Sequence, residues 1–142
     1  MRTEICVIVD TSALMAVLRE EHGSAAIKKA LVTTAGLIPA PVITEYQRVA
    51  TKRGTAPNEK ADATIAFLLR RRSSIEPFTD KDAALSVVAN TRFGIGNGRG
   101  GTLNLLDLMV YAVAKRTGQP ILCTGRDFAA TDAKIHPASW TD

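Results

Sequence analysis

Short apolar runs alternate along this chain with stretches of helical periodicity, and this alternation restricts the possible folds more than any other feature. Four runs are too short for an ordinary helix and are bounded by turn or capping residues, as expected of buried strands: ICVIV (5–9), GLIPA (36–40), SSIEPF (73–78) and PILCT (120–124). Six other segments carry apolar residues at helical spacing: 12–21, 24–34, 41–53, 58–72, 80–92 and 104–117. The pattern predicts an α/β fold with a central parallel sheet of four or five short strands flanked by helices.

The length and composition predict a single domain that spans residues 1–142. A chain of 142 residues with 46% hydrophobic residues is long enough for one core and too short for two ordinary domains. No run of about 18 apolar residues is present and the first residues lack the pattern of a cleaved leader, so we expect a cytoplasmic protein. Cys6 and Cys123 lie inside apolar runs, which predicts buried, reduced thiols. The net charge of +4 favours a polyanionic partner.

Four acidic residues share one placement, because each ends a predicted strand or opens the structure that follows it: Asp10, Glu45, Asp107 and Asp127. The carboxyl ends of parallel strands form one edge of the sheet, where ligands of open α/β sheets bind, so we expect these side chains to converge. Each residue also has an ordinary structural explanation as a helix cap, a first-turn acid or a surface residue. Four carboxylates at one edge nevertheless repel one another unless they are protonated or bind a cation.

The residue types at this edge favour a hard divalent cation over other catalytic chemistry. Carboxylate oxygens suit Mg²⁺ or Mn²⁺, and Mg²⁺ is typically held by one or two protein carboxylates together with waters and substrate phosphates. His22 and His136 are the only histidines, and no serine or cysteine has an evident histidine partner for nucleophilic catalysis. We therefore predict a Mg²⁺ site, with Mn²⁺ as the alternative, and a substrate that carries phosphate.

The sequence resembles the PIN-domain ribonucleases, and more narrowly the VapC toxins of bacterial type II toxin–antitoxin pairs. The resemblance spans the chain and is carried by VIVDTSALMAVL, by the helix with Glu45 and, most specifically, by TLNLLDLMVYAVAKRTGQPILCTGRDFAATD. It implies a PIN-like domain that hydrolyses RNA phosphodiester bonds with the help of Mg²⁺. A catalytically silent PIN-like module that binds RNA or protein is the alternative, and a metal-dependent phosphatase is a third possibility.

The resemblance also implies site residues and partners. Asp10 and Asp107 correspond to the direct metal ligands of the family, and Glu45 corresponds to a further catalytic acid. Asp127 is our choice for the fourth catalytic acid and Asp132 is its rival, because many relatives have two adjacent acids before the Phe and this chain does not. The implied partners are an RNA substrate, a cognate VapB-like antitoxin, and further copies in a homodimer or a toxin–antitoxin hetero-oligomer.

The segment GIGNGRGG (94–101) has the spacing of a dinucleotide-binding loop but not its context. That motif follows a strand, whereas here a capping box formed by Thr79 and Asp82 begins a helix that leads into the loop. We therefore predict no nucleotide cofactor. The loop is either a connector or an RNA contact through Arg99. If the preceding helix runs away from the active edge, residues 93–103 must return to it, and extended they reach roughly 36 Å.

Overall fold

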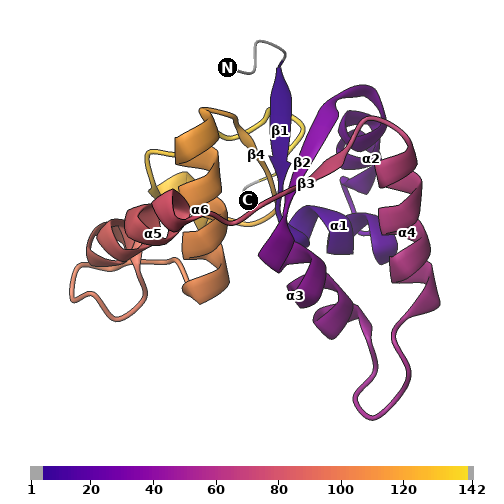
Figure 1. The fold of residues 1–142 in the computed structure, drawn as a ribbon, viewed down its shortest axis with the longest axis horizontal. Helices are drawn as coiled ribbons and strands as arrows, with labels where there is room; N and C mark the ends of the chain where they lie inside the picture. Colours follow the sequence, from indigo (N-terminus) through magenta and orange to yellow (C-terminus); the bar gives the residue numbers. More distant parts are fainter. Residues whose placement is uncertain (1–4, 141–142) are drawn as a thin grey trace.

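A four-stranded parallel sheet forms the centre of the molecule in the computed structural model, which describes residues 5–140 (Figure 1). The strands are β1 (Cys6–Val9), β2 (Ala35–Pro39), β3 (Ser74–Glu76) and β4 (Ile121–Leu122). Their order across the sheet is β3-β2-β1-β4, and each pairing is parallel. The predicted α/β class, the parallel sheet and all four strand positions are thereby confirmed.

Helices cover both faces of the sheet. Within residues 5–140 they are α1 (Thr11–Leu18), α2 (Ser24–Thr33), α3 (Ala40–Ala50), α4 (Glu59–Arg70), α5 (Asp80–Phe93), α6 (Leu105–Thr117) and the short 3-10 helix η1 (Phe128–Ala130). Figure 1 shows α5 and α6 on one side of the sheet and α1, α2 and α4 on the other, while α3 projects from the end of β2. Side chains of Asn58, Thr79 and Asn104 accept hydrogen bonds from the first turns of α4, α5 and α6, which explains where these helices begin.

The central strand β1 shows why the chain adopts this layered arrangement. All four of its residues are fully buried, because helices cover both sides of the sheet, and a continuous apolar run is the sequence pattern of such a strand. Both cysteines are buried thiols and neither is part of a disulfide within residues 5–140, as predicted. Burial raises the pKa of the Cys123 thiol to about 12, so this thiol is not a reactive nucleophile. No helix among residues 5–140 has the length and apolar character needed to cross a membrane.

The two ends of the loop 93–103 lie beside each other. The expectation that this loop returns to the active edge from a remote end of the preceding helix is wrong. The Leu103 N–H donates to the Phe93 carbonyl oxygen at 2.9 Å, and the Ile95 N–H donates to the Leu103 carbonyl oxygen at 2.9 Å. Because α5 packs along α6 and ends beside its start, the loop folds back on itself. Gly101 is required at this closure, since a Cβ there would lie 2.1 Å from the Gly94 carbonyl oxygen.

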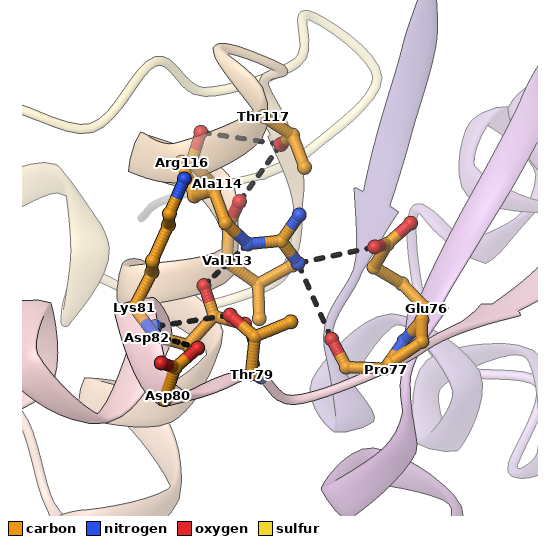
Figure 2. Close-up of polar contacts among 10 residues, drawn as sticks. All are labelled: Glu76, Pro77, Thr79, Asp80, Lys81, Asp82, Val113, Ala114, Arg116 and Thr117. Carbon is orange, nitrogen blue, oxygen red and sulfur yellow. Dashed lines mark hydrogen bonds and ion pairs between the residues drawn. The ribbon is translucent and has the colours of Figure 1, made fainter.

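A buried charge network holds α6 against α5 and the end of β3. Figure 2 shows Arg116 reaching from α6 to Asp82 of α5 and Glu76 of β3. Its Nε donates to Asp82 Oδ1 at 2.6 Å, and an Nη donates to Glu76 Oε2 at 3.0 Å. Burial alone would raise the pKa of Asp82, but the hydrogen bonds from Arg116 and Thr79 outweigh it and hold that pKa below its usual value. Losing one partner of such a buried pair typically costs about 3–5 kcal/mol, because the other charge stays buried.

Candidate active site

Four acidic side chains from separate parts of the chain line one cleft of about 240 Å³ at the carboxyl edge of the sheet. They are Asp10 after β1, Glu45 on α3, Asp107 on α6 and Asp127 after β4. The parallel sheet brings three of them together, because β1, β2 and β4 end at the same edge and Asp10, α3 and Asp127 follow them. Asp107 comes from the start of α6, which follows α5 and the glycine-rich loop. The structure therefore brings together all four of the acids that the sequence singled out, and their catalytic roles remain a proposal.

Asp10 is the most enclosed of the four acids, with 6% of its surface exposed. It is the N-cap of α1, where its Oδ2 accepts hydrogen bonds from the Ser12 N–H at 3.1 Å and the Ser12 hydroxyl at 2.5 Å. Burial raises the pKa of Asp10 to about 6, although the Ser12 hydrogen bonds oppose the shift, and the negative charge of Glu45 adds to it. Asp10 is thus a cap and a member of the cleft at once.

Asp107 combines the same two functions at the start of α6. It forms a capping box with Asn104: the Asn104 side chain accepts from the Asp107 N–H at 2.9 Å, and Asp107 Oδ2 accepts from the Asn104 N–H at 3.1 Å. Burial first, and then the charge of Asp10, raise the pKa of Asp107 to about 7. The charges of Asp127 and Glu45 add to the shift, so each of the other three acids raises the pKa of Asp107.

The two remaining acids are less enclosed. Glu45 is half-buried and lies in the middle of α3, not in its opening as predicted, because the helix already begins at Ala40. Asp127 is exposed and stands at the N-cap position of η1, but its side chain accepts no capping hydrogen bond. Its carbonyl oxygen accepts from the Thr102 hydroxyl at 2.8 Å, which ties the end of the glycine-rich loop to this residue. The Asp127 carboxylate is therefore not engaged in capping.

Asp132, the rival to Asp127, is placed elsewhere and does not line the cleft. It accepts a hydrogen bond from the Tyr111 hydroxyl at 2.5 Å and pairs with Lys115 at 3.4 Å and Arg92 at 3.7 Å. The Tyr111 hydrogen bond, followed by the cation charges, lowers the pKa of Asp132. This acid anchors the segment after η1 to α5 and α6.

The rest of the cleft wall contains hydroxyl, amide and apolar groups: Thr11, Ser12, Thr124, Asn104, Val49 and Phe128. Val49 and Phe128 were not among the residues predicted to lie here. Val49 lies four residues after Glu45, and this i, i+4 spacing on one helix face is the signal that would have placed it there. The Thr11 hydroxyl is buried and has no hydrogen-bond partner among residues 5–140, which leaves a polar group available to a bound ligand or its water.

These donors fit a hard divalent cation that keeps part of its water shell. Burial and the charges of neighbouring acids raise the pKa values of Asp10 and Asp107, and a cation offsets both effects. Among the described residues, no three acidic, histidine or cysteine side chains are grouped closely enough to enclose an ion by themselves. Mg²⁺ does not require such a cage, since one or two carboxylates plus waters and substrate oxygens satisfy it.

The raised carboxyl pKa values predict that the metal-free chain loses stability as the pH rises. Burial raises the pKa values of Asp10 and Asp107 to about 6 and about 7, against 3.8 for an ordinary aspartate, so the folded chain binds more protons than the unfolded chain between these values. The free energy of unfolding should therefore fall from about pH 4 to pH 7 and level off above. A melting series between pH 5 and 8 with chelator measures this.

An Asp107→Asn variant isolates the effect in the same series. His136, whose pKa is lowered by burial, acts in the opposite sense near its own titration, and it is present in both chains. The difference between wild type and variant should change by at least about 1 kcal/mol, or roughly 3 °C in Tm, between pH 5 and 8. If the Tm values of the two chains changed with pH by the same amount across this range, the raised pKa of Asp107 would be contradicted.

Fold and cleft together place the chain in the class of α/β proteins with an acidic cleft at the carboxyl edge of a parallel sheet. Residues 7–134 match the PIN domain family. Ribonuclease VapC28 of Mycobacterium tuberculosis is 32% identical over 133 residues, which cover 87% of this chain and 92% of that relative. The chain therefore belongs to the PIN-domain family and, within it, to the VapC ribonucleases.

Solved structures of related proteins have the same fold. The crystal structure of Mycobacterium tuberculosis VapC20, a Sarcin-Ricin loop cleaving toxin, matches with a TM-score of 0.71 at 18% identity, over 92% of this chain and 99% of that one. VapBC2 from Rickettsia felis, bound to a DNA fragment from its promoter, matches with a TM-score of 0.70 at 14% identity, over 96% of this chain and 99% of that one.

Proposed function

We propose that this chain is a Mg²⁺-dependent endoribonuclease and the toxin of a type II toxin–antitoxin pair. The observation that carries the proposal is the convergence of four acids from distant segments into one cleft, with the pKa of the two most buried acids raised. Membership of the VapC ribonucleases supports RNA as the substrate. RNA turnover that requires a divalent cation distinguishes this function from a silent binding module, which would bind RNA without cleaving it.

Each acid has a role that follows from its surroundings. Asp10 and Asp107 are the proposed metal ligands. The pKa of both carboxyls is raised, and a bound cation would offset the cost of ionising them. A divalent cation held by Asp10 and Asp107 would supply Lewis-acid polarisation of the scissile phosphate, a more acidic water and charge neutralisation at the departing oxygen. Glu45 and Asp127 line the same cleft and are more open to solvent, and their proposed role is to orient the attacking water and accept its proton.

A VapB-like antitoxin is the proposed partner, and an apolar groove offers it a docking surface. The groove lies between α1, α2 and α4, has a volume of about 370 Å³ and is lined by Val17, Leu18, Leu31, Val32, Phe67 and Leu68, among others. Phe67 faces this groove, keeps 40% of its surface exposed and has the Arg71 guanidinium 4.9 Å from its ring centroid, so it offers apolar surface to a partner. An apolar helix of the antitoxin suits this surface, and the Rickettsia felis relative is solved as a VapBC pair.

Replacing Asp127 should slow RNA cleavage more than replacing Asp132. Asp127 lines the cleft, whereas Asp132 is bonded to Tyr111 and Lys115 away from it. We expect Asp127→Asn to lower kcat by at least about tenfold, and Asp132→Asn chiefly to lower the melting temperature. The measurement is initial rates on one RNA substrate beside melting curves for both variants. The reverse order of rates would transfer the fourth role to Asp132.

Arg99→Ala should weaken RNA binding and reduce its salt dependence. Arg99 lies in the exposed part of the glycine-rich loop, and its N–H donates to the Asn97 side chain at 2.8 Å, so the backbone that carries it is ordered. Loss of one phosphate contact lowers the slope of log K against log salt by about 0.7 for single-stranded RNA. Binding to a catalytically silent Asp10→Asn chain, titrated at several salt concentrations, measures the slope. An unchanged slope would leave the loop as a connector.

A further inference from the structure

The Ser12 side chain links the ends of two strands at the floor of the cleft. Its hydroxyl donates a hydrogen bond to Asp10 Oδ2 at 2.5 Å. The same oxygen accepts a hydrogen bond from the backbone N–H of Thr124 at 2.9 Å. Ser12 belongs to α1, directly after β1, and Thr124 follows β4, so this one hydroxyl joins segments that are 112 residues apart in sequence.

The direction of both hydrogen bonds is determined by their chemistry. A backbone N–H can only donate, so the Ser12 oxygen must be the acceptor towards Thr124. The single hydroxyl hydrogen is then left for the Asp10 carboxylate, which in its ionised form can only accept. Ser12 also donates its own N–H to Oδ2 of Asp10, so both bonds from this residue go to the same carboxylate oxygen.

The sheet does not provide this link by itself. The ladder between β1 and β4 pairs Ile8 with Ile121 and Val9 with Leu122. Its last backbone hydrogen bond runs from the Asp10 N–H to the Leu122 carbonyl oxygen at 3.1 Å. Beyond that point both segments leave the sheet: β1 leads into α1, and β4 leads into the turn that contains Asp127. The Ser12 to Thr124 hydrogen bond links the two segments at the height of the cleft.

We propose that Ser12 is a positioning residue, which holds the Asp10 carboxylate in one orientation and sets its separation from the Asp127 side of the cleft. The inference rests on the proposed function, because it assumes that these carboxylates bind a divalent cation. Groups that orient metal ligands in this way commonly contribute 10–100-fold to metal affinity or activity, since a ligand that is free to rotate must be ordered on binding. Ser12 itself does not contact the reacting atoms in this account.

Ser12→Ala tests the proposal through cation binding as well as through cleavage. The variant keeps the Ser12 N–H bond to Asp10, so the N-cap of α1 survives and the chain should fold. We expect the Kd for Mn²⁺, measured by electron paramagnetic resonance without RNA, to rise by about tenfold or more, and kcat for RNA cleavage to fall comparably. Ser12→Thr, which retains a hydroxyl, should restore both quantities to within about threefold of wild type.

Ser139→Ala is the matched control. The Ser139 hydroxyl also binds the backbone of the β4 segment, accepting from the Cys123 N–H at 3.0 Å and donating to the Ile121 carbonyl oxygen at 3.3 Å, but it contacts no acid of the cleft. Its loss should lower the melting temperature at least as much as the loss of the Ser12 hydroxyl. The Kd for Mn²⁺ and kcat should nevertheless stay at wild-type values, because this serine supports the strand from its other side.

The outcomes separate this inference from the proposed function. If the wild-type chain neither binds Mn²⁺ nor cleaves RNA, the proposed function fails and the role of Ser12 fails with it. If the wild type does both and Ser12→Ala matches it in Kd and kcat, the inference alone is overturned. A Ser12→Ala chain that does not fold, or a Ser139→Ala chain that loses cation affinity equally, would show that Ser12 acts only through stability and would also overturn it.

Discussion

Asp10→Asn and Asp107→Asn should each reduce RNA cleavage by at least about a hundredfold. Both residues lie in the cleft with raised carboxyl pKa values, and both are proposed ligands of a cation that supplies the electrophile and the activated water. An amide has the same shape but no negative charge, so the cation loses its strongest attraction. Cleavage of a labelled RNA with Mg²⁺, and its loss on adding chelator to the wild type, is the measurement.

The same two variants should be as stable as the wild type or more stable, which separates loss of chemistry from loss of fold. An Asn at position 10 can still accept from the Ser12 N–H, and removing one carboxylate relieves repulsion among those that remain. Asp80→Asn is a matched control, since Asp80 is an exposed acid at the start of α5 outside the cleft, and its rate should be unchanged. Full activity in either cleft variant, with contaminating nuclease and metal excluded, would falsify the assignment.

Expression of this chain alone in a bacterial host should arrest growth, and co-expression of its antitoxin should restore growth. An uncontrolled ribonuclease depletes RNA that the cell needs, so a hundredfold loss of activity should remove the arrest. Asp10→Asn is therefore expected to be harmless at the same soluble level of protein. Colony counts after induction, with immunoblots that verify expression, measure the effect. Harmless wild-type protein, or an equally toxic Asp10→Asn variant, would favour the silent binding module.

The Asp10→Asn chain should still form the complex with the antitoxin. The apolar groove between α1, α2 and α4 is separate from the acidic cleft, so most of the interface does not depend on the carboxylates. A basic antitoxin side chain that enters the cleft would compete with Mg²⁺ for the same charge, and only this part of the affinity should change.

Phe67→Asp should weaken complex formation while leaving RNA cleavage by the free chain intact. Co-purification of each variant with the antitoxin distinguishes the two contributions.

The local sequence pattern was sufficient to predict the strands and helices, because each of them depends on interactions between residues close together in the sequence. The run ICVIV is apolar at consecutive positions, which suits a strand buried on both faces, and β1 occupies Cys6–Val9 with every residue buried. The capping box predicted at Thr79 and Asp82 is formed, since it involves residues only three positions apart. The convergence of Asp10, Glu45 and Asp127 could be predicted because these acids follow strands and parallel strands end at one edge, whereas Asp107 comes from α6, which follows α5.

The tertiary structure alone decided how the ends of these elements meet. Asp127 and Asp132 both follow β4 closely, and their spacing does not say which one turns towards the cleft; Tyr111 and Lys115 on the neighbouring helix α6 settle it by bonding Asp132. The closed form of residues 93–103 depends on how α5 lies along α6, which the periodicity of either helix does not encode.

The bridge from Asp10 through Ser12 to Thr124 has the same origin. Its first hydrogen bond is local and could be anticipated from the sequence DTS, in which Ser12 follows Asp10 by two positions. Its second bond joins residues 112 positions apart and exists only because β1 pairs with β4. The sequence by itself therefore determined which residue types stand at the active edge. Chain packing determined their distances and hydrogen-bond partners, because these arise between segments that no local interaction brings together.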